Sequence, residues 1–153
     1  PPQRSQAALA DLPQCDALCP PDRTVLAGLP MALRLPGDYE TALQELRRFN
    51  PPDSPYVRAV ESGFQAAGPA GADRAAADFL AAKSSPPKLT VARFYAAAGD
   101  VDLAFDWLEQ AYENRIPQLL HVVAYPEFDS LRADPRYQDL LERIGISEEA
   151  LRR

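Results

Sequence analysis

The chain has 153 residues, of which 46% are hydrophobic and 25% charged, and its formal net charge is −6. This size and composition are typical of one globular domain with its own core. The acidic balance argues against a surface for nucleic-acid phosphates or anionic lipids, because both need clustered basic side chains. No apolar run approaches the roughly 18 residues of a membrane span. We therefore expect neither nucleic-acid binding nor membrane insertion by this chain.

Residues 1–22 are predicted to form an N-terminal arm, with a helix that ends near Leu18 and a break before the next helix at 24–35. The arm contains the only two cysteines, Cys15 and Cys19. Helical i,i+4 geometry makes a disulfide between them awkward, whereas a non-helical segment could close one. Two buried or half-buried thiols, a disulfide and a metal site stay open, although no second Cys or His pair lies nearby to complete a metal site. The compartment stays open: a cytoplasmic location is slightly favoured, and a periplasmic one is possible if the two cysteines form a disulfide.

A period of 31 residues organises the segment 23–117. Three of the seven glycines, Gly37, Gly68 and Gly99, have this spacing, and each lies between two helical patterns. Proline-containing breaks at 49–55, 83–88 and 114–118 end the second helix of each pair. Apolar residues recur in the same register: Leu29, Val60 and Val91; Leu33, Phe64 and Tyr95; Leu46, Ala77 and Leu108. The pattern predicts three helical hairpins with glycine turns in an all-α solenoid. Asp38 and Asp100 are expected to cap the helices that follow these turns.

Residues 118–153 are predicted to be a repeat remnant followed by capping helices. Asp134 has the position of an N-cap, and Pro135 suits the first helical position. Gly145 is expected to end this helix, whose apolar stripe is Tyr137, Leu140, Leu141 and Ile144. His121 lies in the apolar run "LLHVVAY", so we expect a half-buried ring on a helix, with a ligand contact or a pH sensor as the functional alternative.

The unit 89–117 resembles a tetratricopeptide repeat. The matching residues are Ala92, Tyr95, Gly99, Asp100, Ala104, Leu108, Ala111 and Pro117, and the first unit matches at Leu33, Gly37, Asp38, Tyr39, Ala42 and Leu46. The resemblance implies a right-handed α-solenoid of about three hairpins. The period is 31 rather than the 34 residues usual in that family, which implies shortened helices or loops. The middle unit has Asp73 where the others have alanine, so its helix pairing is expected to be irregular.

A narrower resemblance lies in the C-terminal segment, which is similar to the last repeat and tail of bacterial regulators. The residues that carry it are Trp107, Leu108, Phe128, Asp129, Leu131, Arg132, Asp134, Pro135, Arg136 and Tyr137. In those proteins the repeats follow a DNA-binding winged helix or a signalling catalytic domain, and nothing in this sequence looks like either. The resemblance implies a sensing or interaction module.

No motif indicates catalysis or a cofactor. His121 is the only histidine, and "GPAGAD" lacks the Lys-Ser/Thr of a phosphate loop. Asp100, Asp102 and Asp106 lack the glycine and terminal glutamate of a calcium loop, so they are expected to form a solvated face. We therefore expect a protein that is not an enzyme.

The 31-residue register suggests a binding surface on the first helices, whose outward residues line the concave groove of tetratricopeptide proteins. Met31 and Arg93 share one register position, and Arg34 and Gln65 share another. The two arginines are suited to hold a carboxylate or a peptide C-terminus, the alternative being solvated surface side chains. This hypothesis predicts that Arg93→Ala weakens binding without lowering thermal stability. The predicted groove residues are Met31, Arg34, Gln65, Arg93, His121 and Tyr125.

The favoured interpretation is a non-catalytic scaffold that binds a protein or peptide. The alternative is a small-molecule-binding or, less favoured, an enzymatic groove, based on Arg93, His121 and Tyr125 together with the cysteine pair. Self-association through the N-terminal end of the solenoid is a further possibility, because that end lacks an obvious polar cap.

Overall fold

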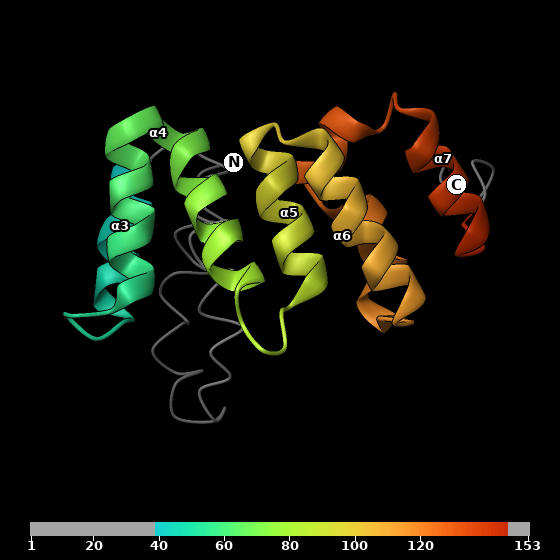
Figure 1. Cartoon of the computed structure of the whole chain (residues 1–153). Helices are drawn as coiled ribbons and strands as arrows, with labels where there is room; N and C mark the ends of the chain where they lie inside the picture. The colour runs from blue at the N-terminus through green and yellow to red at the C-terminus, as the bar shows by residue number, and fades with distance from the viewer. Residues whose placement is uncertain (1–38, 147–153) are drawn as a thin grey trace, which may run out of the picture. The chain divides into compact units, whose positions relative to one another are not determined.

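The computed structural model describes residues 39–146, and within this range every regular element is helical, so the all-α prediction is confirmed there (Figure 1). The predicted N-terminal helices and both cysteines lie outside the described residues. None of the described helices has the length and apolar character needed to cross a membrane. The elements are α3 (Tyr39–Arg48), α4 (Pro55–Ala81), α5 (Lys88–Ala98), α6 (Val101–Glu113), the 3₁₀ helices η1 (Pro117–Ala124) and η2 (Pro126–Leu131), and α7 (Pro135–Arg143).

The chain divides into two compact units, Pro1–Val57 and Arg58–Arg153. In the described part of the first unit, α3 buries Ala42, Leu43 and Leu46, which form one stripe at helical spacing. Glu40 lies in its first turn and basic residues lie in its last turn, so both ends complement the helix dipole. The contacts described in the following paragraphs lie among described residues of the second unit.

The helix α4 consists of two helical runs that meet at Ala67 and Gly68. Gly68 has φ 62° and ψ −149°, a backbone conformation that is essentially restricted to glycine, because a Cβ atom would clash with the backbone. Pro69 begins the second run, where its missing N–H would have no helical partner in any case. The predicted turn at Gly68 is therefore present.

The two runs of α4 touch backbone to backbone at Gly63 and Gly71. A Cβ atom added to Gly63 would lie 2.3 Å from the carbonyl oxygen of Gly71, and one added to Gly71 would lie 2.2 Å from that of Gly63. The second run also buries Asp73, which is 1% exposed, at the register position that Ala104 occupies in the next hairpin. The close pairing of the two runs depends on Gly63 and Gly71, because neither residue carries a side chain.

The helices α5 and α6 form the next hairpin and lie side by side in Figure 1. Gly99 has φ 86°, its N–H donates to the carbonyl of Ala96 (3.1 Å), and the N–H of Asp100 donates to that of Tyr95 (2.9 Å). These two bonds define a Schellman motif. The prediction that Asp100 caps α6 is wrong, because its side chain makes no capping bond and instead accepts from Arg74 at 3.0 Å.

A second Schellman motif ends α6, with an arginine in place of the glycine. The N–H of Arg115 donates to Tyr112 (2.9 Å) and that of Ile116 donates to Ala111 (3.0 Å). Arg115 has φ 52° and is the one non-glycine residue with positive φ in the described range. Its Cβ therefore lies close to its own carbonyl, a conformation that is costly for L-residues.

This pair of turns gives opposite predictions for opposite substitutions. Arg115→Gly should raise the free energy of unfolding by about 1 kcal/mol, because the left-handed conformation is free of steric cost for glycine. Gly99→Ala should lower it by about 1 kcal/mol for the same reason, since an added Cβ meets no atom within 4 Å and only the backbone is strained. Urea denaturation of both variants measures these changes. Equal signs for the two variants would contradict this account of the turns.

The segment after α6 differs from the predicted apolar helix around His121. It forms η1 and η2, and each begins at a proline, Pro117 and Pro126. Tyr125 between them is extended (φ −90°, ψ 115°), because the residue before a proline is sterically disfavoured in a helix. The 3₁₀ turns still bury Leu119, Val122, Phe128 and Leu131.

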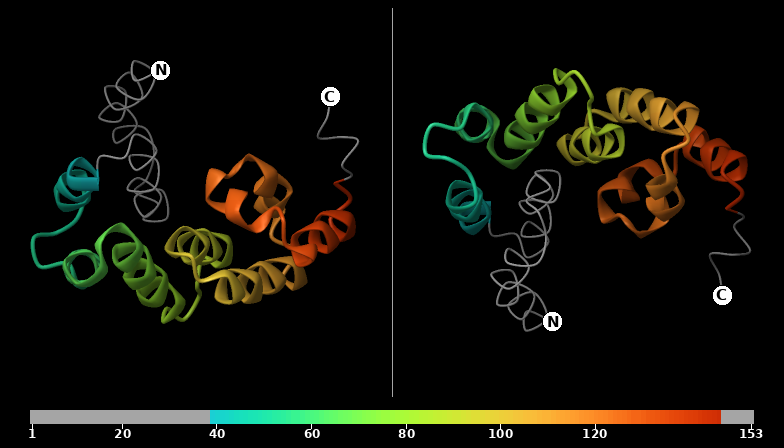
Figure 2. Two further views of the ribbon diagram at one scale, coloured as in Figure 1. Left: turned by 90° about the horizontal axis from the view of Figure 1, so that it is seen from above. Right: turned by 90° about the horizontal axis from the view of Figure 1, so that it is seen from below.

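The helix α7 begins and ends as predicted. The Asp134 carboxylate accepts from the Arg136 N–H (2.9 Å), Pro135 occupies the first turn, and Gly145 follows the helix with φ 80°. Its buried face consists of Tyr137, Leu140 and Leu141. In both views of Figure 2, α7 lies next to α6, and η2 contacts α5.

Candidate partner-binding surface

Arg93 projects from α5 between Ala92 and Phe94, both of which are buried. Its guanidinium carbon lies 4.1 Å from the centroid of the Tyr125 ring, a cation–π distance. Its Nη2 donates to Oε1 of Glu127 at 3.0 Å. The Arg93 side chain is 20% exposed and that of Glu127 is 7% exposed. Arg93 is therefore largely enclosed by the chain itself. We call Arg93, Tyr125 and Glu127 the Arg93 cluster.

The ion pair in the Arg93 cluster is made through one hydrogen bond. Nε of Arg93 and Oε2 of Glu127 are both buried, and neither has a hydrogen-bond partner in the part of the chain that the structure describes. A two-bond guanidinium–carboxylate pair would use both atoms and would be stronger. The stack on Tyr125 therefore contributes to holding the arginine in place.

The Tyr125 ring is positioned by the core beneath it. Its edge meets Phe128 at a centroid distance of 6.2 Å and an interplanar angle of 81°, the T-shaped geometry that aromatic pairs prefer. Phe128 is fully buried. The extended backbone of Tyr125 between η1 and η2 thus places its ring where it covers Arg93.

The structure brings two of the predicted groove residues, Arg93 and Tyr125, into contact. Gln65 is exposed on the first run of α4, and His121 is exposed on η1, so the expectation of a half-buried His121 is wrong. Leu120, beside His121, is 57% exposed. Within the described range, no hydrogen bond or ring contact joins Gln65 or His121 to Arg93. The predicted residues Met31, Arg34, Cys15 and Cys19 lie outside that range.

A second polar contact, not foreseen in the sequence, links the second run of α4 to α5. The Tyr95 hydroxyl donates to Oδ1 of Asp78 at 2.6 Å. Burial, followed by this hydrogen bond and the Asp78 charge, raises the pKa of Tyr95 to about 12. Both residues lie within the 31-residue pattern, but their helices meet only in three dimensions, so the pair has no local sequence signal.

The raised pKa predicts a loss of stability at high pH. The folded protein holds the Tyr95 proton more tightly than the unfolded chain does, because the pKa of an unperturbed tyrosine is near 10.0. The stabilisation is therefore complete below pH 10 and is lost as the pH rises to about 12. The advantage of the wild type over Tyr95→Phe should shrink by roughly 1–2 kcal/mol over this range in urea denaturation. If the difference in free energy of unfolding between the two proteins stayed constant with pH, the raised pKa of Tyr95 would be contradicted.

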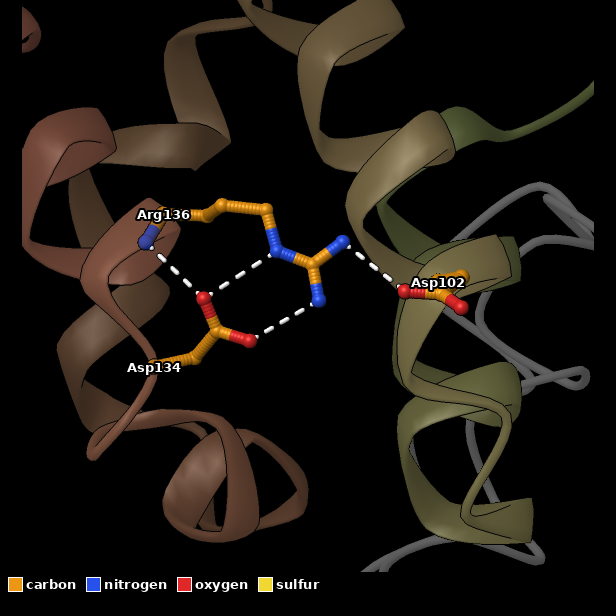
Figure 3. Close-up of polar contacts among 3 residues, drawn as sticks. All are labelled: Asp102, Asp134 and Arg136. Carbon is orange, nitrogen blue, oxygen red and sulfur yellow. Dashed lines mark hydrogen bonds and ion pairs between the residues drawn. The ribbon is translucent and has the colours of Figure 1, made fainter.

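On α7, Arg136 contacts α6 in the arrangement shown in Figure 3. Its Nη1 donates to Oδ1 of Asp102 (2.9 Å), and its Nη2 donates to Oδ2 of Asp134 (2.8 Å). The guanidinium carbon lies 4.1 Å from the centroid of the Phe105 ring. The side-chain bond from Arg136 holds the pKa of Asp134 below its usual value.

Arg143, the last residue of α7, repeats this arrangement. Its Nη1 donates to Oε2 of Glu109 at 3.0 Å, and its Nη2 also bonds to this carboxylate. The guanidinium carbon lies 4.6 Å from the Tyr112 ring centroid, and Nε pairs with Asp139 at 2.8 Å.

The two arrangements differ by seven residues on both helices. On α6 the carboxylate precedes the aromatic ring by three residues in each case. Because the pairs advance together along both helices, α6 and α7 run parallel through this contact. We call this contact the α6–α7 clamp; its residues are Asp102, Phe105, Glu109, Tyr112, Arg136 and Arg143.

The residues that carry the resemblance to bacterial regulators have structural roles in the tail. Phe128, Leu131 and Tyr137 are buried in the core. Arg132 donates to the carbonyl of Val123 at 3.0 Å and pairs with Asp129 at 2.8 Å. The buried residues and the bonds of Arg132 show that this part of the residue pattern stabilises the fold of η1, η2 and α7.

Among the described residues, no group of three or more His, Cys, Asp or Glu side chains is arranged to hold a metal ion. Comparisons of the chain with protein-family models, with curated proteins and with solved structures gave no match. The resemblance to tetratricopeptide proteins stays a prediction.

Proposed function

We propose that this chain is a non-catalytic helical-repeat scaffold that binds a protein or peptide partner. The observation that carries the proposal is the pair of successive helical hairpins in the second unit. They turn at Gly68 and Gly99, which are 31 residues apart and both have positive φ (62° and 86°). Repeated hairpins bury one face against their neighbours and leave the outward residues of their first helices as a continuous surface.

The surface proposed for the partner consists of Gln65, Arg93, His121 and Tyr125, with the exposed Leu120 beside it. An amide, a cation, an imidazole and an apolar side chain together suit an extended peptide. The guanidinium of Arg93 has several N–H donors, and one of them is used by Glu127. Because the Arg93 side chain is 20% exposed, a remaining donor is suited to a second carboxylate, such as a peptide C-terminus.

The proposed biological setting is the sensing or interaction module of a bacterial regulatory protein. Its support is the residue pattern of the tail, from Trp107 to Tyr137, in the sequence. On this proposal the chain contributes recognition, and any output activity belongs to another domain or protein.

The test is binding of labelled protein to two libraries of short random peptides on beads, one with free C-terminal carboxylates and one amidated. We expect enrichment from the first library only. The double variant Gln65→Glu/His121→Glu should lose at least tenfold in affinity for the enriched peptides, because it adds negative charge to the surface.

The control variant is Ser84→Glu/Ser85→Glu, which adds two glutamates at exposed positions between α4 and α5. It should bind as the wild type does. Enrichment of no peptide from either library would contradict the scaffold proposal. Equal binding of amidated peptides would contradict the preference for a carboxylate alone.

A further inference from the structure

The segment 117–146, here called the C-terminal unit, is attached to the α5–α6 hairpin by three ion pairs with one common sequence separation. In each pair the partners are 34 residues apart: Arg93 with Glu127, Asp102 with Arg136, and Glu109 with Arg143. Each of these arginines also stacks on an aromatic ring across the same boundary. The hairpin and the C-terminal unit therefore meet through a surface of matched charges.

The connection between the two parts is short and strained. The residues 114–116 join α6 to η1, and Arg115 among them has φ 52°. The Schellman bonds that reverse the chain here require this conformation. If residues 114–116 were extended instead, Arg115 would regain an ordinary backbone conformation. A strained hinge of this kind favours exchange of the segment that follows it.

We infer that the C-terminal unit exchanges between two copies of the chain, so that each unit docks on the α5–α6 hairpin of the other. The partner for this surface is a second copy because the charges and rings already match in register. The exchanged dimer keeps all three ion pairs and all three stacks and differs from the monomer only at the hinge. Association costs the two copies translational freedom, and this cost becomes smaller as the protein concentration rises. The dimer population should therefore increase with protein concentration.

The first test measures the mass of the wild-type protein after refolding from urea at low micromolar and at millimolar concentration, by native mass spectrometry and light scattering. We expect a dimer fraction that grows with concentration. Arg115→Gly should lower the association constant of the dimer by roughly 10- to 30-fold. The reason is that glycine removes the steric cost at the hinge of each of the two monomers, so the monomers gain stability. A wild-type protein that is monomeric throughout, or a dimer unaffected by Arg115→Gly, would overturn the inference.

The second test separates exchange from other dimers. One variant carries Asp102→Arg and Glu109→Arg, and the other carries Arg136→Glu and Arg143→Glu. Alone, each has like charges across the α6–α7 clamp in the monomer and in its own dimer. Refolded together, they regain opposite charges at both contacts only in an exchanged heterodimer. We expect a one-to-one heterodimer; a mixture that contains none would overturn the inference.

Discussion

Gly71→Ala is expected to destabilise the protein by about 2 kcal/mol, although alanine favours a helix over glycine by about 1 kcal/mol. The added Cβ would lie 2.2 Å from the carbonyl oxygen of Gly63. A backbone atom cannot turn aside as a side chain can, so the two runs of α4 must separate, at a cost of about 3 kcal/mol. The clash therefore outweighs the propensity. Chemical denaturation monitored by circular dichroism measures the change.

The control for this prediction is Ser62→Ala, at an exposed position one residue before Gly63. It changes helix propensity without adding an atom to the contact, so its effect should stay within about 0.5 kcal/mol. A stabilising Gly71→Ala would show that the two runs of α4 are not in backbone contact.

The second large effect is expected for Arg93→Ala, which should lower the free energy of unfolding by about 2–3 kcal/mol. The substitution leaves the Glu127 carboxylate, whose side chain is 7% exposed, without the one cation that hydrogen-bonds to it within residues 39–146. It also removes the stack on Tyr125. The expectation that Arg93→Ala leaves stability unchanged is therefore replaced, and Arg93 variants are poor probes of binding.

A double-mutant cycle with Glu127→Ala distinguishes the ion pair from simple loss of packing. The double variant Arg93→Ala/Glu127→Ala should be much less destabilised than the sum of the two single variants. Arg58→Ala, at an exposed position on α4, serves as the control and should change stability by less than about 0.5 kcal/mol. Additive effects of the two single variants would contradict a direct ion pair.

The glycine and proline pattern predicted much of the local structure. Gly68, Gly99 and Gly145 all have positive φ at helix ends, which only their missing side chains make inexpensive. Asp134 caps α7 as its position before a proline predicts. These features are local, because a turn or a cap depends on residues within a few positions of one another.

The contacts that define the candidate surface were harder to predict from the sequence. Glu127 gave no signal as the partner of Arg93, because an ion pair 34 residues apart depends on how η2 lies against α5. The register predicted Arg93 as an outward residue but not its enclosure by Tyr125. The α-helix expected around His121 failed because Pro117 and Pro126 favour two short 3₁₀ turns, a choice that apolar periodicity does not distinguish.

The parallel course of α6 and α7 determines how the tail responds to mechanical force. Tension along the chain enters α6 at its start, near Asp102, and leaves α7 at its end, near Arg143. These points lie at opposite ends of the α6–α7 clamp, so both ion pairs are loaded in shear at the same time. Neighbouring antiparallel helices would instead separate one contact after another. Within the C-terminal unit, α7 is therefore the helix that resists pulling from the C-terminal side.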